Sequence, residues 1–76
     1  MKPLKMEIYE KLKEIMRESE KRGVYDDELL AYLRRKGYDL GVSEFNKVLL
    51  SMEIEGLITV RWAGKGKRLI MPYEAG

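Results

Sequence analysis

The stretch RWAGKGKRL, residues 61–69, combines cationic side chains with glycines. Its cations are Arg61, Lys65, Lys67 and Arg68. Lysine and arginine bind phosphate groups, while Gly64 and Gly66 permit a tight turn and a close approach of the backbone to a ligand. The stretch therefore predicts a basic hairpin tip that contacts an anion. The alternative is a solvated turn whose charges protect exposed strand edges.

A second cationic cluster consists of Arg34, Arg35 and Lys36, and Gly37 follows it directly. Cations in the last turn of a helix stabilise its negative end, which explains such a cluster without any ligand. Three cations in succession are more than a helix end needs, so phosphate binding is the other interpretation. The positive charge is concentrated in the second half, since residues 34–76 carry eight cations and five acids.

The chain has 76 residues and contains neither cysteine nor histidine. Disulfides, the common zinc ligands and the usual general base are therefore missing, and we expect no metal and no cofactor. The segment AGKGKR lacks the spacing and the Ser or Thr of a nucleotide-binding P-loop. The carboxylate pair Asp26 and Asp27 is explained by the start of a helix. We expect that the protein is not an enzyme and has no small-molecule ligand.

The composition favours one small globular domain over residues 1–76, with 45% hydrophobic and 37% charged residues. The apolar runs are too short to cross a bilayer, and the N-terminus lacks a signal-peptide core. We therefore expect a cytoplasmic protein without membrane contact. Abundant Lys, Arg and Glu, with no glutamine and one asparagine, favour a thermophilic source.

The apolar spacing predicts three helices, at about residues 4–22, 26–36 and 43–55. Pro3 suits the start of the first helix and Gly23 its end, while Asp26 and Ser43 are the predicted N-caps of the other two. LITVRW, the glycine turn AGKG and KRLIMP predict a two-stranded β-hairpin at about residues 57–72. The predicted fold is α+β.

The third predicted helix has two distinct sides. Phe45, Val48, Leu49 and Met52 form the side that is expected to be buried. The opposite side carries Ser43, Asn46, Lys47, Leu50 and Ile54, with Glu44 and Ser51 at one margin. Leu50 and Ile54 are apolar where a solvated helix is usually polar, and they align with Lys47. This opposite side is the candidate binding face.

The residues Leu49, Met52, Gly56, Leu57 and Ile58, in LLSMEIEGLITV, resemble the winged helix-turn-helix family. VSEFNKVL is similar to the start of that family's recognition helix, and VYDDELLAYL is similar to the support helix that precedes it. The resemblance covers nearly the whole chain. In size and composition the chain resembles small regulators of archaea and of their plasmids and viruses.

The resemblance implies a sequence-specific, autoregulatory transcription regulator whose third helix enters the major groove of double-stranded DNA. By position, the residues facing the groove would be Ser43, Asn46, Lys47, Leu50 and Ser51. Phosphate or minor-groove contacts would come from the end of the support helix, at Arg34, Arg35 and Lys36, and from the hairpin or wing, at Arg61, Gly64, Lys65, Gly66, Lys67 and Arg68. The alternatives are a protein–protein interaction module with the same fold and a nonspecific nucleic-acid binder.

Individual side chains on this face suggest particular contacts. The amide of Asn46 can pair bidentately with an adenine edge, Lys47 can bond guanine or a phosphate, and Leu50 can contact a thymine methyl group. Glu44 is either an acceptor for a cytosine amino group or, as we prefer, a favourable charge in the first helical turn. Trp62 is expected to pack in the core or against the wing rather than to stack on DNA.

One domain of this size covers few base pairs, so a homodimer is expected, at least on DNA. Met6 and Tyr9 widen the apolar arc of the first helix beyond the stripe that a core needs. They either cover the edge of the core or form the dimer contact. Leu50 and Ile54 are the alternative dimer contact.

Overall fold

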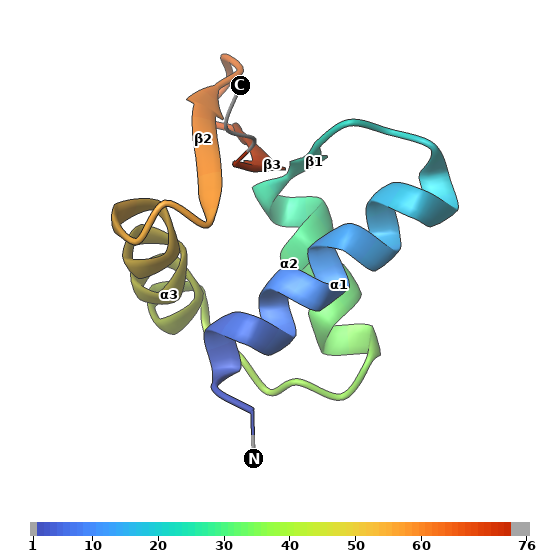
Figure 1. The fold of residues 1–76 in the computed structure, drawn as a ribbon, viewed down its shortest axis with the longest axis vertical. Coiled ribbons are helices and arrows are strands. Elements are labelled where there is room, and N and C mark those ends of the chain that lie inside the picture. The colour runs from blue at the N-terminus through green and yellow to red at the C-terminus, as the bar shows by residue number, and fades with distance from the viewer. Residues whose placement is uncertain (1, 74–76) are drawn as a thin grey trace.

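The computed structural model describes residues 2–73, which form three helices and a three-stranded antiparallel sheet (Figure 1). The elements are α1 (Leu4–Ser19), β1 (Val24–Tyr25), α2 (Asp26–Arg35), α3 (Val42–Ile54), β2 (Ile58–Trp62) and β3 (Arg68–Pro72). The strand order is β1-β3-β2. The predicted α+β class is confirmed. Within the described residues, no helix is both long and apolar enough to cross a membrane.

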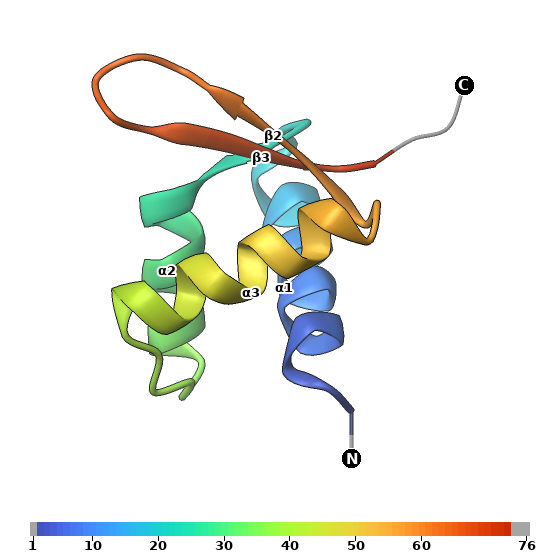
Figure 2. The ribbon, with the colours of Figure 1, turned by 90° about the vertical axis from the view of Figure 1, so that its left-hand side faces the viewer.

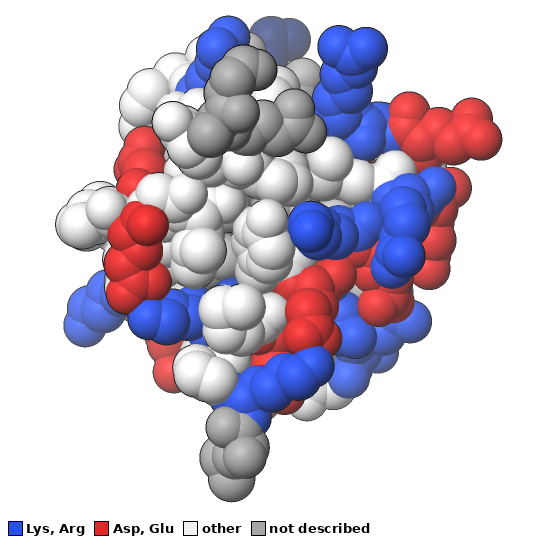
Figure 3. Space-filling model, in the orientation of Figure 1, with Lys and Arg blue, Asp and Glu red and all other residues white. Residues whose placement is uncertain are grey.

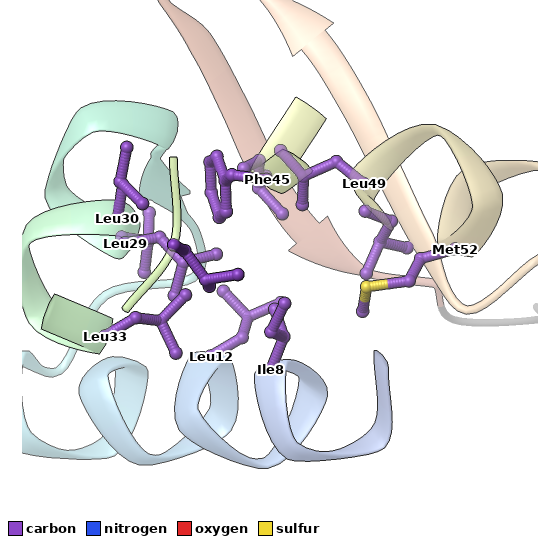
Figure 4. Packing of buried hydrophobic residues seen from close by; sticks show 12 residues of the cluster. Ile8, Leu12, Leu29, Leu30, Leu33, Phe45, Leu49 and Met52 are labelled. Atoms are coloured by element: carbon purple, nitrogen blue, oxygen red, sulfur yellow. The ribbon is translucent and has the colours of Figure 1, made fainter. Parts of the chain in front are cut away.

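The hydrophobic core lies where the three helices meet, and the sheet closes it. Figure 4 shows side chains from all three helices pointing toward one another, among them Ile8, Leu12, Leu29, Leu30, Leu33, Phe45, Leu49 and Met52. Ile58 of β2 and Ile70 of β3 are buried against the same cluster. Burial of each such side chain contributes about 1.5–3 kcal/mol. Because α3 turns Phe45, Leu49 and Met52 inward, its opposite side faces outward.

The strand β1 is a difference from the two-stranded hairpin that the sequence predicts. Val24 and Tyr25 pair with β3, which makes the sheet three-stranded. A Cβ atom on Gly23 would lie 2.7 Å from Cγ of Met71 and 3.1 Å from the carbonyl oxygen of Ile70. Glycine at position 23 therefore lets the chain approach β3 closely enough to pair. Two residues are too few to show strand alternation, so the sequence gives no sign of β1.

The predicted end of α1 at Gly23 is wrong, because the helix ends at Ser19. Glu20 adopts the left-handed conformation with a φ of 54°, although it is not a glycine. The backbone N–H of Lys21 then donates to the carbonyl oxygen of Met16 at 3.1 Å, which closes the last turn. Gly23 instead serves the contact with β3.

The predicted N-caps of α2 and α3 are also displaced. Asp26 is the first helical residue of α2 rather than its cap, and Tyr25 occupies the capping position. The backbone N–H of Tyr25 donates to Oε1 of Glu28 at 3.2 Å, so a glutamate in the first turn stabilises the helix start. In α3, Val42 is the first helical residue, and Ser43 lies inside the first turn.

Strands β2 and β3 form a hairpin that runs across the top of the helices, and its tip extends beyond them (Figure 2). Gly64, Lys65 and Gly66 all have positive φ angles at this tip, of 80°, 55° and 74°. The N–H of Ala63 donates to the carbonyl oxygen of Lys67 at 2.9 Å and closes the turn. Three successive left-handed residues explain why two glycines are needed here.

Neighbouring residues of β2 point to opposite faces of the sheet. Ile58 is buried against the helices, so Val60 and Trp62 lie on the same face as Ile58. Thr59 and Arg61 therefore lie on the outer face. This alternation assigns the tryptophan and the arginine at the end of β2 to different surfaces of the molecule.

Candidate nucleic-acid interface

The outward side of α3 is the candidate binding face, and no other described element lies over it (Figure 2). Ser43, Lys47, Leu50 and Ser51 are all exposed there, as the sequence predicts. Leu50 and Ile54 are 58% and 77% exposed, so a large part of this face is apolar. Lys47 makes no ion pair with any residue from 2 to 73 and is free to meet a ligand.

Asn46 lies at the hairpin flank of α3 and is half-buried. Nη2 of Arg68 donates a hydrogen bond to its Oδ1 atom. Because a guanidinium group can only donate, the amide oxygen of Asn46 must face Arg68 and its nitrogen must face the other way. Asn46 therefore has an intramolecular partner that the sequence did not indicate. One of its two acceptor positions is occupied.

Arg68 connects the hairpin to both α2 and α3. Besides Asn46, its Nε atom donates to Oδ2 of Asp26 at 2.9 Å. The side chains of Arg68 and Asp26 are only 21% and 16% exposed. Burial alone would raise the pKa of the Asp26 carboxyl, but hydrogen bonds from Arg68 and from backbone N–H groups outweigh it and hold that pKa below its ordinary value. Arg68 thus stabilises the fold, which the prediction of a phosphate contact did not foresee.

The other hairpin cations have weaker intramolecular partners or none among the described residues. Nζ of Lys67 lies 3.4 Å from Oδ2 of Asp27 and 5.5 Å from the centre of the Tyr25 ring, in an exposed pair of low strength. Arg61 and Lys65 form no ion pair with the described residues. The four cations of the RWAGKGKRL stretch therefore occupy three environments: one inside the fold, one loosely paired and two open.

The cations at the end of α2 mostly have local partners. Nε and Nη2 of Arg34 donate to the carbonyl oxygen of Leu40 at 3.1 and 2.9 Å, which fixes the loop after the helix. Nζ of Lys36 lies 3.7 Å from Oε1 of Glu14, and both Lys36 and Arg35 lie near the ring of Tyr32. Arg34 has a structural task that competes with its predicted phosphate contact.

Trp62 does not pack in the core, contrary to the expectation from the sequence. Its side chain is 75% exposed at the end of β2. It borders a cleft of about 560 Å³ between the starts of α2 and α3 and the hairpin. Phe45, Asn46, Lys67 and Arg68 line the same cleft. Strand alternation places Trp62 on the same face of β2 as the buried Ile58. The strand extends past the core before it reaches Trp62, so the side chain remains exposed.

The structure assembles a second cationic region, which sequence reasoning missed. Two adjoining hollows, of about 540 and 650 Å³, lie between α1, the segment after it and the end of the sheet. Their cationic lining residues are Lys13, Arg17, Lys21, Arg22 and Arg61, and no acidic residue lines either hollow among those described. We call this region the α1 groove. The spacing of Tyr9, Lys13 and Arg17, four residues apart, was the available signal.

Met6 and Tyr9, the predicted dimer contact, are both half-buried on α1. Tyr9 packs partly against the core cluster, and Nζ of Lys13 lies 5.0 Å from the centre of its ring. Tyr9 also lines the α1 groove.

Within residues 2–73, no group of three or more Asp or Glu side chains is arranged to hold a metal ion. Comparisons of the chain with protein-family models, with curated proteins and with solved structures find no match.

Proposed function

We propose that the protein is a sequence-specific regulator that binds double-stranded DNA as a winged helix-turn-helix, with α3 in the major groove and the hairpin as the wing. The observation that carries this proposal is the uncovered outward side of α3, with a hairpin projecting beside it (Figure 2). An α-helix is about 10–12 Å in diameter and the major groove is about 12 Å wide, so one helix fills the groove.

On this proposal the centre of the α3 face contacts bases. Ser43 and Lys47 can hydrogen-bond to base edges or phosphates, and Leu50 can contact a thymine methyl group. Asn46 lies nearer the hairpin, with its amide oxygen turned to Arg68. Its amide nitrogen is free to donate a hydrogen bond to a base. Bidentate pairing with adenine also requires the amide oxygen to accept a hydrogen bond, and the lone pair that Arg68 does not use is available for that.

The hairpin supplies the nonspecific part of the contact. Lys65 lies at the tip, and Lys67 can exchange its exposed pairing with Asp27 for a phosphate. Arg68 contributes indirectly, since it holds the base of the hairpin against α2 and α3. Two copies on neighbouring half-sites would give the protein a useful site length, and control of its own gene is the simplest regulatory role.

The test is binding to the DNA upstream of the protein's own gene, with a scrambled fragment of the same composition beside it. We expect tighter binding to the upstream fragment, and Lys47→Ala and Leu50→Ala should reduce that preference. The exposed residue Arg35, at the far end of α2, provides the control: Arg35→Gln should leave the preference unchanged. Equal affinity of the wild-type protein for both fragments would refute sequence-specific binding.

A second candidate function is contact with another protein. Its support is the apolar character of the exposed residues around α3, namely Val42, Leu50, Ile54 and Trp62. Apolar groups exposed together are typical of protein interfaces. This alternative predicts weak dependence of binding on salt, whereas phosphate contacts give a steep one.

A further inference from the structure

We propose that the α1 groove binds the phosphate backbone of a second DNA segment while α3 occupies the first. This inference goes beyond the proposed function, because it assigns a nucleic-acid contact to the side of the sheet that faces away from α3. The groove is lined by Lys13, Arg17, Lys21, Arg22 and Arg61, and no described acidic residue lines it.

Three of the four acidic residues of α1 have other partners. Glu10 pairs with Lys2, with 2.5 Å between Nζ and Oε2. The hydroxyl of Tyr32 donates to Oε1 of Glu14 at 2.6 Å, on the α2 side of the helix. Glu18 also lies beside that hydroxyl. These three carboxylates are thus engaged elsewhere, and no glutamate of α1 lines the groove.

The cations of the groove are available. Among the residues that the structure describes, Lys13, Arg17, Arg22 and Arg61 have no ion-pair partner, and Lys21 lies 3.6 Å from Oε2 of Glu28 in an exposed pair. Figure 3 shows Lys and Arg side chains over the C-terminal part of α1 and the segment that follows, with Asp and Glu side chains beside some of them.

The shape of the groove favours an extended polyanion. Its two hollows share Met16, Lys21 and Pro72, so they adjoin one another along the groove. Lys13 and Arg17 are one helical step of about 6 Å apart along α1, and Arg61 adds a cation from the sheet. A compact ion would use one or two of these groups, whereas a DNA strand can use all of them. A second copy of the chain has a net charge of +2, so it matches this groove less well than the polyanion DNA.

The groove and the α3 face lie on opposite sides of the hairpin. Trp62 borders the cleft beside α3, and the next residue along β2, Arg61, lines the α1 groove. Because neighbouring strand residues point to opposite faces, one duplex on α3 does not reach both surfaces. The consequence is that a single protein molecule can bridge two DNA segments.

The experiment uses a target duplex fixed to beads and a second, labelled duplex of random sequence, which the protein must capture. The groove variant is Lys13→Gln/Arg17→Gln/Arg61→Gln. The matched control, Lys2→Gln/Lys11→Gln/Arg35→Gln, removes the same charge at positions that line neither the groove nor the cleft beside α3. Circular dichroism melts establish that both variants fold. Direct titration of the target duplex at two salt concentrations is done in parallel.

We expect the groove variant to lose capture of the second duplex at least tenfold while its preference for target over random DNA is unchanged. The slope of the logarithm of the affinity for the second duplex against the logarithm of the salt concentration should become less steep by about 2.5–3, since each phosphate contact contributes about 0.9. Capture equal to that of the wild type would overturn the inference. So would capture of phosphatidylserine vesicles or polyglutamate with no capture of DNA. Loss of direct binding of the groove variant to the target duplex would also overturn the inference, because the groove would then be the first binding site. If Lys47→Ala and Leu50→Ala leave the preference for target DNA unchanged while the groove variant loses capture, the proposed role of α3 fails and the groove inference stands.

Discussion

The two faces of the hairpin differ in how they could hold a nucleic acid. The face beside α3 offers apolar groups and hydrogen-bonding side chains, with Lys47 as its open cation on the helix. The α1 groove offers five cations and no lining carboxylate among the described residues. Base edges are read by shape and hydrogen bonds, and phosphates are held by charge. The difference suggests that reading and holding are divided between the faces.

The largest expected effect is that of a substitution on the outward face of α3. Leu50→Glu places a negative charge where we propose that DNA bases lie, and it removes an apolar contact. We expect the affinity for the target duplex to fall by at least tenfold, in the range of about 1–3 kcal/mol per base contact. Fluorescence anisotropy measures it. Ala31→Glu, on the exposed side of α2, adds the same charge elsewhere, and an equal loss there would mean that net charge alone decides.

The next effect separates the two arginines of the hairpin. Arg68→Met removes hydrogen bonds to Asp26 and Asn46, and we expect a loss of about 1–3 kcal/mol in the free energy of unfolding. Arg61→Met, on the outer face, should change it by less than about 0.5 kcal/mol. Urea denaturation of both variants gives the comparison. Similar losses would contradict the assignment of Arg68 to the interior.

A smaller effect concerns the acid stability of the α3 side. The pKa of Asp26 lies below its ordinary value of 3.8, so its ionised form stabilises the folded state. That contribution is complete above pH 3.8 and is lost as the pH falls through the pKa of the folded state. We expect the melting temperature of Asp26→Asn to depend less on pH in this range than that of the wild type. Parallel curves would show that Arg68 does not stabilise the carboxylate.

The smallest effect lies at the hairpin tip, between the two faces. Lys65 has a φ of 55°, a conformation that costs a non-glycine residue roughly 1 kcal/mol. Lys65→Gly should therefore raise the free energy of unfolding by about 0.5 kcal/mol while weakening DNA binding. Lys67→Gly, at a position without a positive φ, should lower stability. Denaturation and anisotropy on the same samples would reveal whether stability and binding change in opposite directions, as we expect.

Local sequence signals predicted most of the fold. Apolar spacing located the three helices and the buried side of α3, because Phe45, Leu49 and Met52 recur at helical intervals. It did not locate β1, whose pairing depends on the space beside Met71, or the exact helix ends. Helix ends depend on single hydrogen bonds, such as that from the Tyr25 N–H to Glu28.

The candidate site was less predictable than the fold. Runs of cations are visible in the sequence, but their partners are not. Arg68 donates a hydrogen bond to Asp26, 42 positions earlier, and Arg34 donates to the carbonyl oxygen of Leu40, six positions later. The α1 groove could not be predicted for the opposite reason: Lys13, Arg17 and Arg61 lie apart in the sequence and come together only in the fold. Charge becomes a surface property only when the fold has placed it.

The contacts of Arg68 also have a mechanical consequence. The base of the hairpin is bonded to the first turn of α2 and to Asn46 of α3, whereas among the described residues the one ion pair between the five-residue tip and the helices is that of Lys67 with Asp27. We therefore expect the base of the hairpin to be more rigid than its tip. We expect DNA that contacts the tip to displace the turn more readily than the base of the hairpin.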